Sequence, residues 1–194
     1  MKRAYLTASV CLLVLVCAGN AYLQRADLSK SQAKVSVQHT TDDRGVKITT
    51  FKLDPVLIEN NEAGKAFVLL LASVIYEDKS PATKHVSLNF HARSRECRFS
   101  NKADLLLVLD DGTITLTNGP GKSGEGTLWV YSEPEDDLCI ESCAAIISEQ
   151  TFSRLIRSKN VEARLGEVTL RLGAIPLQAL RELAAYVRTT KGAQ

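Results

Sequence analysis

Polar and apolar side chains alternate strictly between residues 85 and 95. The polar positions, which carry ring nitrogens, an amide, a hydroxyl and a guanidinium, are His85, Ser87, Asn89, His91 and Arg93. The apolar positions are Val86, Leu88, Phe90 and Ala92. Because successive side chains of a strand point to opposite faces, this pattern predicts a half-buried strand of an antiparallel sheet. Either the polar face is a solvated sheet surface, or His85, Asn89, His91 and Arg93 contact a ligand or partner.

Two aromatic residues are candidates for a second binding surface. Trp129 and Tyr131 are two positions apart in a predicted strand over 127–132, so they share one face. Aromatic side chains at this spacing commonly pack in the core or along a sheet edge. We therefore expect packing for this pair and keep a sugar-binding platform as the alternative.

The histidines also limit what an enzyme could be. A Ser-His-Asp or Cys-His site would have to use His39, His85 or His91, the three histidines of the chain. No Gly-x-Ser-x-Gly elbow accompanies them to position a nucleophile. We expect a non-enzymatic protein with no catalytic residues and no cofactor. The alternatives are a secreted hydrolase that follows none of the standard motifs, and a structural accessory protein.

The segment 119–124 contains Gly-Lys-Ser, the sequence with which a phosphate-binding P-loop ends. The full motif needs another glycine five residues before Gly121, and Leu116 stands there. The segment also joins two predicted strands, so no helix N-terminus would be available to hold a phosphate. The sequence therefore predicts a glycine-rich loop in preference to a nucleotide site.

Three of the five cysteines, Cys97, Cys139 and Cys143, lie beyond residue 21. If 138–147 is a strand, Cys139 and Cys143 lie on one face about 13 Å apart, which is too far for a disulfide. If that segment is a turn or helix, those two could pair. Cys97 could pair with either across neighbouring strands. Because neither Cys-x-x-Cys nor another tight ligand pair occurs, we expect no redox-active pair and no metal site.

The N-terminus has the three parts of a secretory signal. Lys2 and Arg3 provide the positive start, and the uncharged segment 4–16 provides the apolar core. Small residues follow, which predicts cleavage after Ala21, with cleavage after Ala18 as the alternative. The sequence therefore predicts an exported protein, located in the periplasm or outside the cell.

Membrane attachment is the alternative location. The signal could stay uncleaved as an anchor, or Cys17 could carry a lipid, although bulky Val16 stands where lipoprotein processing needs a small residue. After signal cleavage we expect no stable membrane span, because the next apolar run, 66–76, is far shorter than the roughly 20 residues that a helix needs.

The net charge of the chain indicates which classes of partner to expect. The chain has 24 Lys and Arg against 22 Asp and Glu, and removing Lys2 and Arg3 leaves 22 of each. Nucleic-acid binding domains usually carry a basic excess or stripe, so we expect no nucleic-acid partner. The partner that the sequence leaves open is an unknown envelope protein or a small ligand.

The segments predict a signal peptide over 1–21, a polar lead-in over 22–45 and a single α+β domain over 46–190. The expected architecture is a largely antiparallel sheet with a short helix over 149–158 and a C-terminal amphipathic helix over 175–188 packed on one face. The predicted strands cover 46–59, 66–77, 85–95, 104–109, 113–117, 127–132, 138–147, 161–165 and 168–172, with a short one at 35–39. Pro55 predicts an edge or a break in its strand. Asp111-Gly112 and Gly166-Glu167 are the expected hairpin turns.

The C-terminal third resembles the tail of exported bacterial proteins of unknown function. The residues that carry this resemblance are Ile147-Ser148-Glu149-Gln150-Thr151-Phe152, Val161-Glu162-Ala163-Arg164-Leu165-Gly166 and Leu177-Gln178-Ala179-Leu180-Arg181-Glu182-Leu183-Ala184. The resemblance implies a bacterial protein of the cell envelope. It lends no activity, ligand or catalytic residue.

Overall fold

A computed structural model describes residues 34–61, 66–77, 83–99, 104–117, 126–135 and 137–191. All of them belong to one compact unit, Gln32–Gln194. The described residues form two antiparallel sheets and two helices, so the α+β fold class predicted from the sequence is confirmed.

The larger sheet has seven strands, and every neighbouring pair is antiparallel. Its strands are β1 (Val35–Thr41), β2 (Lys47–Leu53), β3 (Val56–Asn61), β4 (Ala66–Glu77), β5 (Thr83–Ser94), β8 (Gly126–Glu135) and β9 (Leu138–Ile147). The order is β1-β2-β4-β5-β9-β8, with β3 also paired to β4. Among the described strands, β1 and β8 therefore form the two outer edges.

The predicted break at Pro55 is confirmed. β2 ends at Leu53 and β3 begins at Val56, and both strands pair with β4 on its same side. Proline lacks the N–H that would continue a ladder, so one long segment becomes two strands with a step between them.

A smaller sheet has the order β11-β10-β6-β7. Its strands are β6 (Leu105–Leu109), β7 (Gly112–Leu116), β10 (Val161–Leu165) and β11 (Val168–Leu172). The second hairpin turns at Gly166-Glu167, as predicted, and Gly166 adopts a positive φ of 59°. The first turn is one residue earlier than predicted. Leu109 pairs with Gly112, so Asp110 and Asp111 form the loop.

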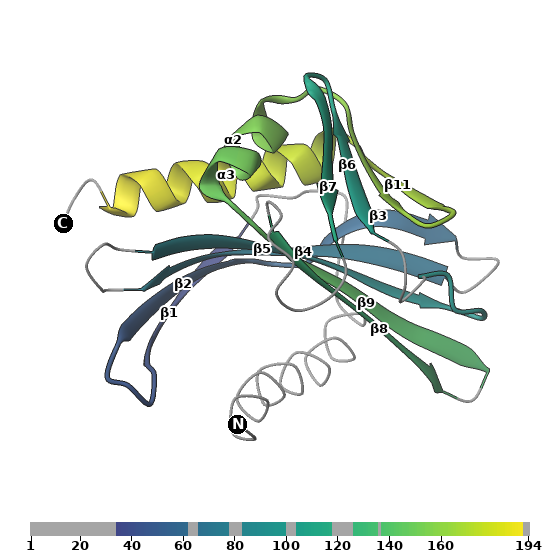
Figure 1. Ribbon diagram of the computed structural model, residues 1–194, viewed down its shortest axis with the longest axis horizontal. Coiled ribbons are helices and arrows are strands. Elements are labelled where there is room, and N and C mark those ends of the chain that lie inside the picture. The colour runs from purple at the N-terminus through teal and green to yellow at the C-terminus, as the bar shows by residue number, and fades with distance from the viewer. Residues whose placement is uncertain are drawn as a thin grey trace. The chain divides into compact units, whose positions relative to one another are not determined.

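Two helices and the smaller sheet lie on one side of the larger sheet (Figure 1). The helices are α2 (Glu149–Arg157) and α3 (Ala174–Lys191). The Ser148 hydroxyl accepts a hydrogen bond from the Thr151 backbone N–H at 3.1 Å, which satisfies a free donor in the first turn of α2. Neither described helix combines the length and apolarity that a membrane crossing requires.

The inner face of the larger sheet, which the helices and smaller sheet cover, is almost completely buried. Its buried side chains are Phe51, Leu53, Val68, Leu70, Ala72, Val74, Val86, Leu88, Phe90, Ala92, Leu128, Cys143, Ala145 and Ile147. The opposite face, here called the outer face, is only half-buried on β4, at Leu69, Leu71 and Ile75. The apolar run of β4 is therefore buried on its inner face and only half-buried on its outer face.

Candidate functional site

The outer face of the larger sheet carries the predicted polar positions of β5. His85, Asn89, His91 and Arg93 all lie there and are half-buried. Asn89, His91 and Arg93 follow one another at two-residue spacing and form one cluster. His85 lies about 13 Å from Asn89 along the strand. The four predicted residues are therefore on one face, but His85 is outside the cluster.

The register places a polar pair at the centre of this cluster. His91 faces Ser142 of β9, and their Nδ1 and Oγ atoms are 3.2 Å apart, within hydrogen-bonding distance. Burial lowers the pKa of His91 below its usual range, because removing water disfavours the charged ring. His91 is therefore neutral at pH 7, with one nitrogen able to accept a hydrogen bond.

Two buried polar atoms beside this pair lack a hydrogen-bond partner among the described residues. Among the described residues, no hydrogen-bond partner reaches Asn89 Oδ1 or Arg93 Nε. Buried polar groups normally have partners, so each such atom needs an explanation, and a bound molecule is one. The amide oxygen can accept and the guanidinium can donate, which gives the cluster both hydrogen-bonding capacities.

Two exposed aromatic side chains continue the outer face onto β8. Trp129 is 47% exposed and Tyr131 is 46% exposed. Their cross-strand partners are Ala144 and Ser142, whose small side chains leave the rings uncovered. Core packing of this pair is therefore wrong, and the pair lies instead on an edge strand with both rings partly exposed. The two-residue spacing correctly placed the rings on one face, but the edge position of β8 depends on strand order.

Tyr131 has a defined polar contact. Its hydroxyl donates to Glu133 Oε2 at 2.6 Å, and this contact raises the pKa of Tyr131. The hydrogen bond holds the phenol along β8. The ring face stays available for stacking because the bond uses the hydroxyl at its edge.

Rows of residues connect β8 to β5 across β9. One row runs Tyr131, Ser142, His91, Leu69, and the next runs Trp129, Ala144, Asn89, Leu71. Each row therefore has an exposed ring at one end and a half-buried leucine at the other. The polar side chains of Ser142, His91 and Asn89 lie between them. We name the set Asn89, His91, Arg93, Trp129, Tyr131 and Ser142 the outer-face patch.

A second cluster lies where β9 meets the segment after β5. Cys97 and Cys139 form a disulfide, with their Cα atoms 5.3 Å apart. This is one of the pairings that the sequence left open. Cys143 is a free, buried thiol on the same strand face as Cys139, and burial raises its pKa to about 12.

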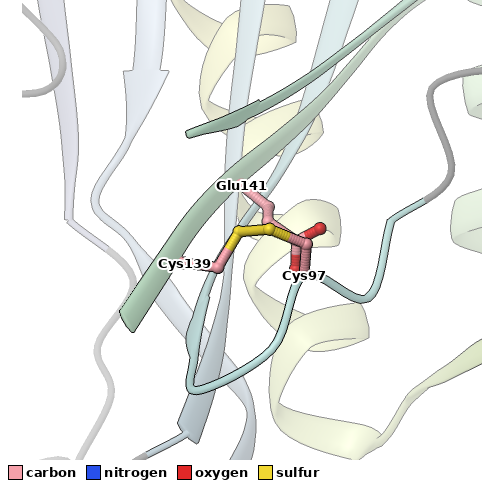
Figure 2. Close-up of side chains that lie close together, drawn as sticks. All are labelled: Cys97, Cys139 and Glu141. Atoms are coloured by element: carbon pink, nitrogen blue, oxygen red, sulfur yellow. A yellow bond between two sulfur atoms is a disulfide. The ribbon is translucent and has the colours of Figure 1, made fainter. Parts of the chain in front are cut away.

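Glu141 lies beside the disulfide, and its side chain is fully buried (Figure 2). Its carboxylate accepts hydrogen bonds from the backbone N–H groups of Arg98, at 2.8 Å, and Phe99, at 2.5 Å. The Ser132 hydroxyl donates to it at 3.3 Å. One carboxylate thus fixes the segment that carries Cys97. No motif in the sequence pointed to Glu141.

Three potential ligand atoms meet at this cluster. The sulfur atoms of Cys97 and Cys139 and a carboxylate oxygen of Glu141 all lie within 4.8 Å of one another. The sequence predicted no metal site because the two cysteines are 42 residues apart and form no tightly spaced cysteine pair.

The glycine-rich segment 119–124 lies outside the described residues. Comparison with known proteins does not assign either cluster: no family model, curated protein or solved structure matches this chain.

Proposed function

We propose that this protein is an exported bacterial domain that binds a small ligand or an envelope partner through the outer-face patch, without catalysing a reaction. The exposure of Trp129 and Tyr131 next to polar groups is the observation that carries the proposal. Large aromatic rings on a protein surface stabilise a complex when a partner covers them, because apolar area is removed from water.

The patch favours a ligand with one apolar face and several hydrogen-bonding groups. The two rings offer surfaces for stacking. Asn89 Oδ1 and Arg93 Nε lack partners among the described residues, so a ligand could satisfy both. The neutral His91 ring adds a further group for hydrogen bonding. A sugar or a peptide side chain has this combination of surfaces.

Export is supported by the sequence and by the disulfide. The signal-like N-terminus precedes a domain that closes Cys97 and Cys139 into a disulfide. Disulfides persist in the periplasm and outside the cell, and are rare in the cytosol. The resemblance of the C-terminal third to exported bacterial proteins agrees with this location.

Trp129 gives a direct test because it is the one tryptophan in the chain. Its fluorescence therefore reports from the patch without interference from another tryptophan. We expect envelope glycans or peptides, tested as a panel, to change the emission of Trp129 in a saturable manner and to protect it from a soluble quencher.

Substitutions identify the surface that is responsible. Y131A and R93A should each weaken binding about tenfold or more if these side chains are central to the interface. I175A is the matched control, because Ile175 is 54% exposed at the start of α3, away from the outer face. Binding that survives Y131A, H91A and R93A unchanged would contradict the assignment of the patch.

A secreted hydrolase is the second candidate, and the contact between His91 and Ser142 favours it. A hydroxyl within reach of a neutral imidazole is the start of a nucleophile–base pair. A fluorophosphonate probe distinguishes the two functions. A hydrolase would be labelled at Ser142, and S142A would abolish labelling. A binding domain would stay unlabelled while Trp129 still responded to ligand.

A further inference from the structure

We propose that Cys97, Cys139 and Glu141 form a binding site for a thiophilic divalent cation, such as Zn²⁺, when the disulfide is reduced. The cation and the disulfide are alternative ways to join the same two sulfur atoms. This inference is independent of the outer-face patch and of the proposed function.

The positions of the ligand atoms suit such a cation. All three lie within 4.8 Å of one another, and the two cysteine Cα atoms are 5.3 Å apart. Zinc binds thiolate sulfur at about 2.3 Å and carboxylate oxygen at about 2.0–2.2 Å. Small side-chain rotations that separate the sulfur atoms can therefore bring all three ligands onto one ion. A fourth, tetrahedral position stays open for water.

Glu141 is already oriented as a metal-binding carboxylate would be. The backbone N–H of Arg98 donates to Oε2 and that of Phe99 donates to Oε1, and Oε2 keeps a second lone pair for an ion. Hydrogen bonds of this kind orient metal ligands in known sites. Because Oε1 also accepts from Ser132, Oε2, which among the described residues accepts from Arg98 alone, is the oxygen that can bind an ion with little rearrangement.

Charge and access also favour a cation. Reduction places two ionisable thiols beside a fully buried carboxylate, and a divalent ion compensates such a group of anions. The guanidinium of nearby Arg98 contacts Glu59 at 3.1 Å. Cys97 is exposed, which gives the ion a path from solvent.

The chemistry balances with a thiol reductant. A dithiol transfers two electrons to the sulfur–sulfur bond, which yields two protein thiols, and becomes a disulfide itself. Binding of the cation then displaces one proton from each thiol. Exchange with a small-molecule disulfide, which accepts the two electrons and leaves as two thiols, re-forms the bond between Cys97 and Cys139 and releases the ion. The site is thus available before disulfide formation or after reduction.

Cobalt(II) is the probe, because thiolate ligands give it a charge-transfer absorption band. The purified chain is reduced with a phosphine, freed of reductant without oxygen and titrated with Co²⁺. We expect the band in the reduced protein, its absence in the oxidised protein, and its loss when Zn²⁺ is added. Circular dichroism confirms that the reduced protein stays folded.

Three variants locate the ligands. C97S should abolish the band, and because Cys97 is exposed, this change removes no core packing. E141Q should keep thiolate absorption and weaken Co²⁺ binding about tenfold or more. C143S is the matched control and should change neither the absorption band nor the affinity for Co²⁺. A missing band in reduced wild type, an unchanged band in C97S, or unchanged affinity in E141Q would overturn the proposed site.

Discussion

The three described cysteines differ in burial and in bonding according to their surroundings. Cys97 is exposed and disulfide-bonded, Cys139 is buried and disulfide-bonded, and Cys143 is buried and free. Burial alternates along β9 and places Cys139, Glu141 and Cys143 on the inner face of the larger sheet. The sequence alone does not reveal this face, because the outer positions Leu138, Ile140 and Ile146 are as apolar as the inner ones. The sequence also does not show that the segment after β5 supplies the backbone N–H groups that donate to the Glu141 carboxylate.

The state of Cys143 leads to a prediction. Its thiol is buried and its pKa is raised to about 12, so the reactive thiolate is scarce at pH 8 and shielded from reagents. We expect iodoacetamide to leave Cys143 unmodified in the native protein and to alkylate it after denaturation without reductant. Peptide mass spectrometry measures this site separately from the other cysteines. Rapid alkylation of Cys143 in the native protein would contradict the conclusion that its thiol is shielded from solvent.

Local elements were largely predictable. β4, β9, β10 and β11 have the predicted bounds, since each is an apolar or alternating run flanked by turn residues. The separation into two sheets was not predictable, because it depends on which distant strands pair. β6 pairs with β10, more than fifty residues later, and β8 becomes an edge. For the same reason, the exposure of Trp129 could not be read from its spacing.

The N-cap of α2 gives a prediction for an element. Ser148 Oγ accepts the Thr151 N–H bond, and alanine at this position would leave that donor without its partner. We expect S148A to lower the free energy of unfolding by about 1 kcal/mol, measured by denaturant titration. S153A within the same helix is the control and should have a smaller effect. Equal effects of the two substitutions would argue against the cap.

The whole molecule is stabilised by a crosslink between distant segments. Cys97 and Cys139 are 42 residues apart, so their disulfide restricts a large loop of the unfolded chain. We expect reduction, or the C97S/C139S pair, to lower the free energy of unfolding by about 4 kcal/mol according to the loop-entropy relation. Denaturant titration with and without reductant measures this. Equal stability of the two states would show that the crosslink contributes nothing.

The stability of the whole molecule should also depend on pH. Hydrogen bonds and ion pairs lower the pKa values of four carboxyl groups in the folded protein: Asp42, Asp110, Asp111 and Glu162. A folded-state pKa below the unfolded one means that the folded protein binds fewer protons. These carboxyl groups therefore contribute their full stability above their unfolded-state pKa values, about 4. That contribution is lost as the pH falls through their folded-state pKa values. We expect thermal stability to decrease steadily below about pH 5.

Asp110 allows this pH dependence to be tested at one group. It accepts hydrogen bonds from the backbone N–H groups of Lys159, at 2.6 Å, and Asn160, at 3.2 Å, so it joins the β6–β7 turn to the segment after α2. The Lys159 bond is the main reason that its pKa is lowered. D110N should therefore be less stable than wild type at pH 7, and the difference should shrink as acid protonates Asp110 in wild type. Thermal unfolding of both proteins across this range measures the difference. A difference that stays constant with pH would mean that the charge of Asp110 has no part in holding the turn.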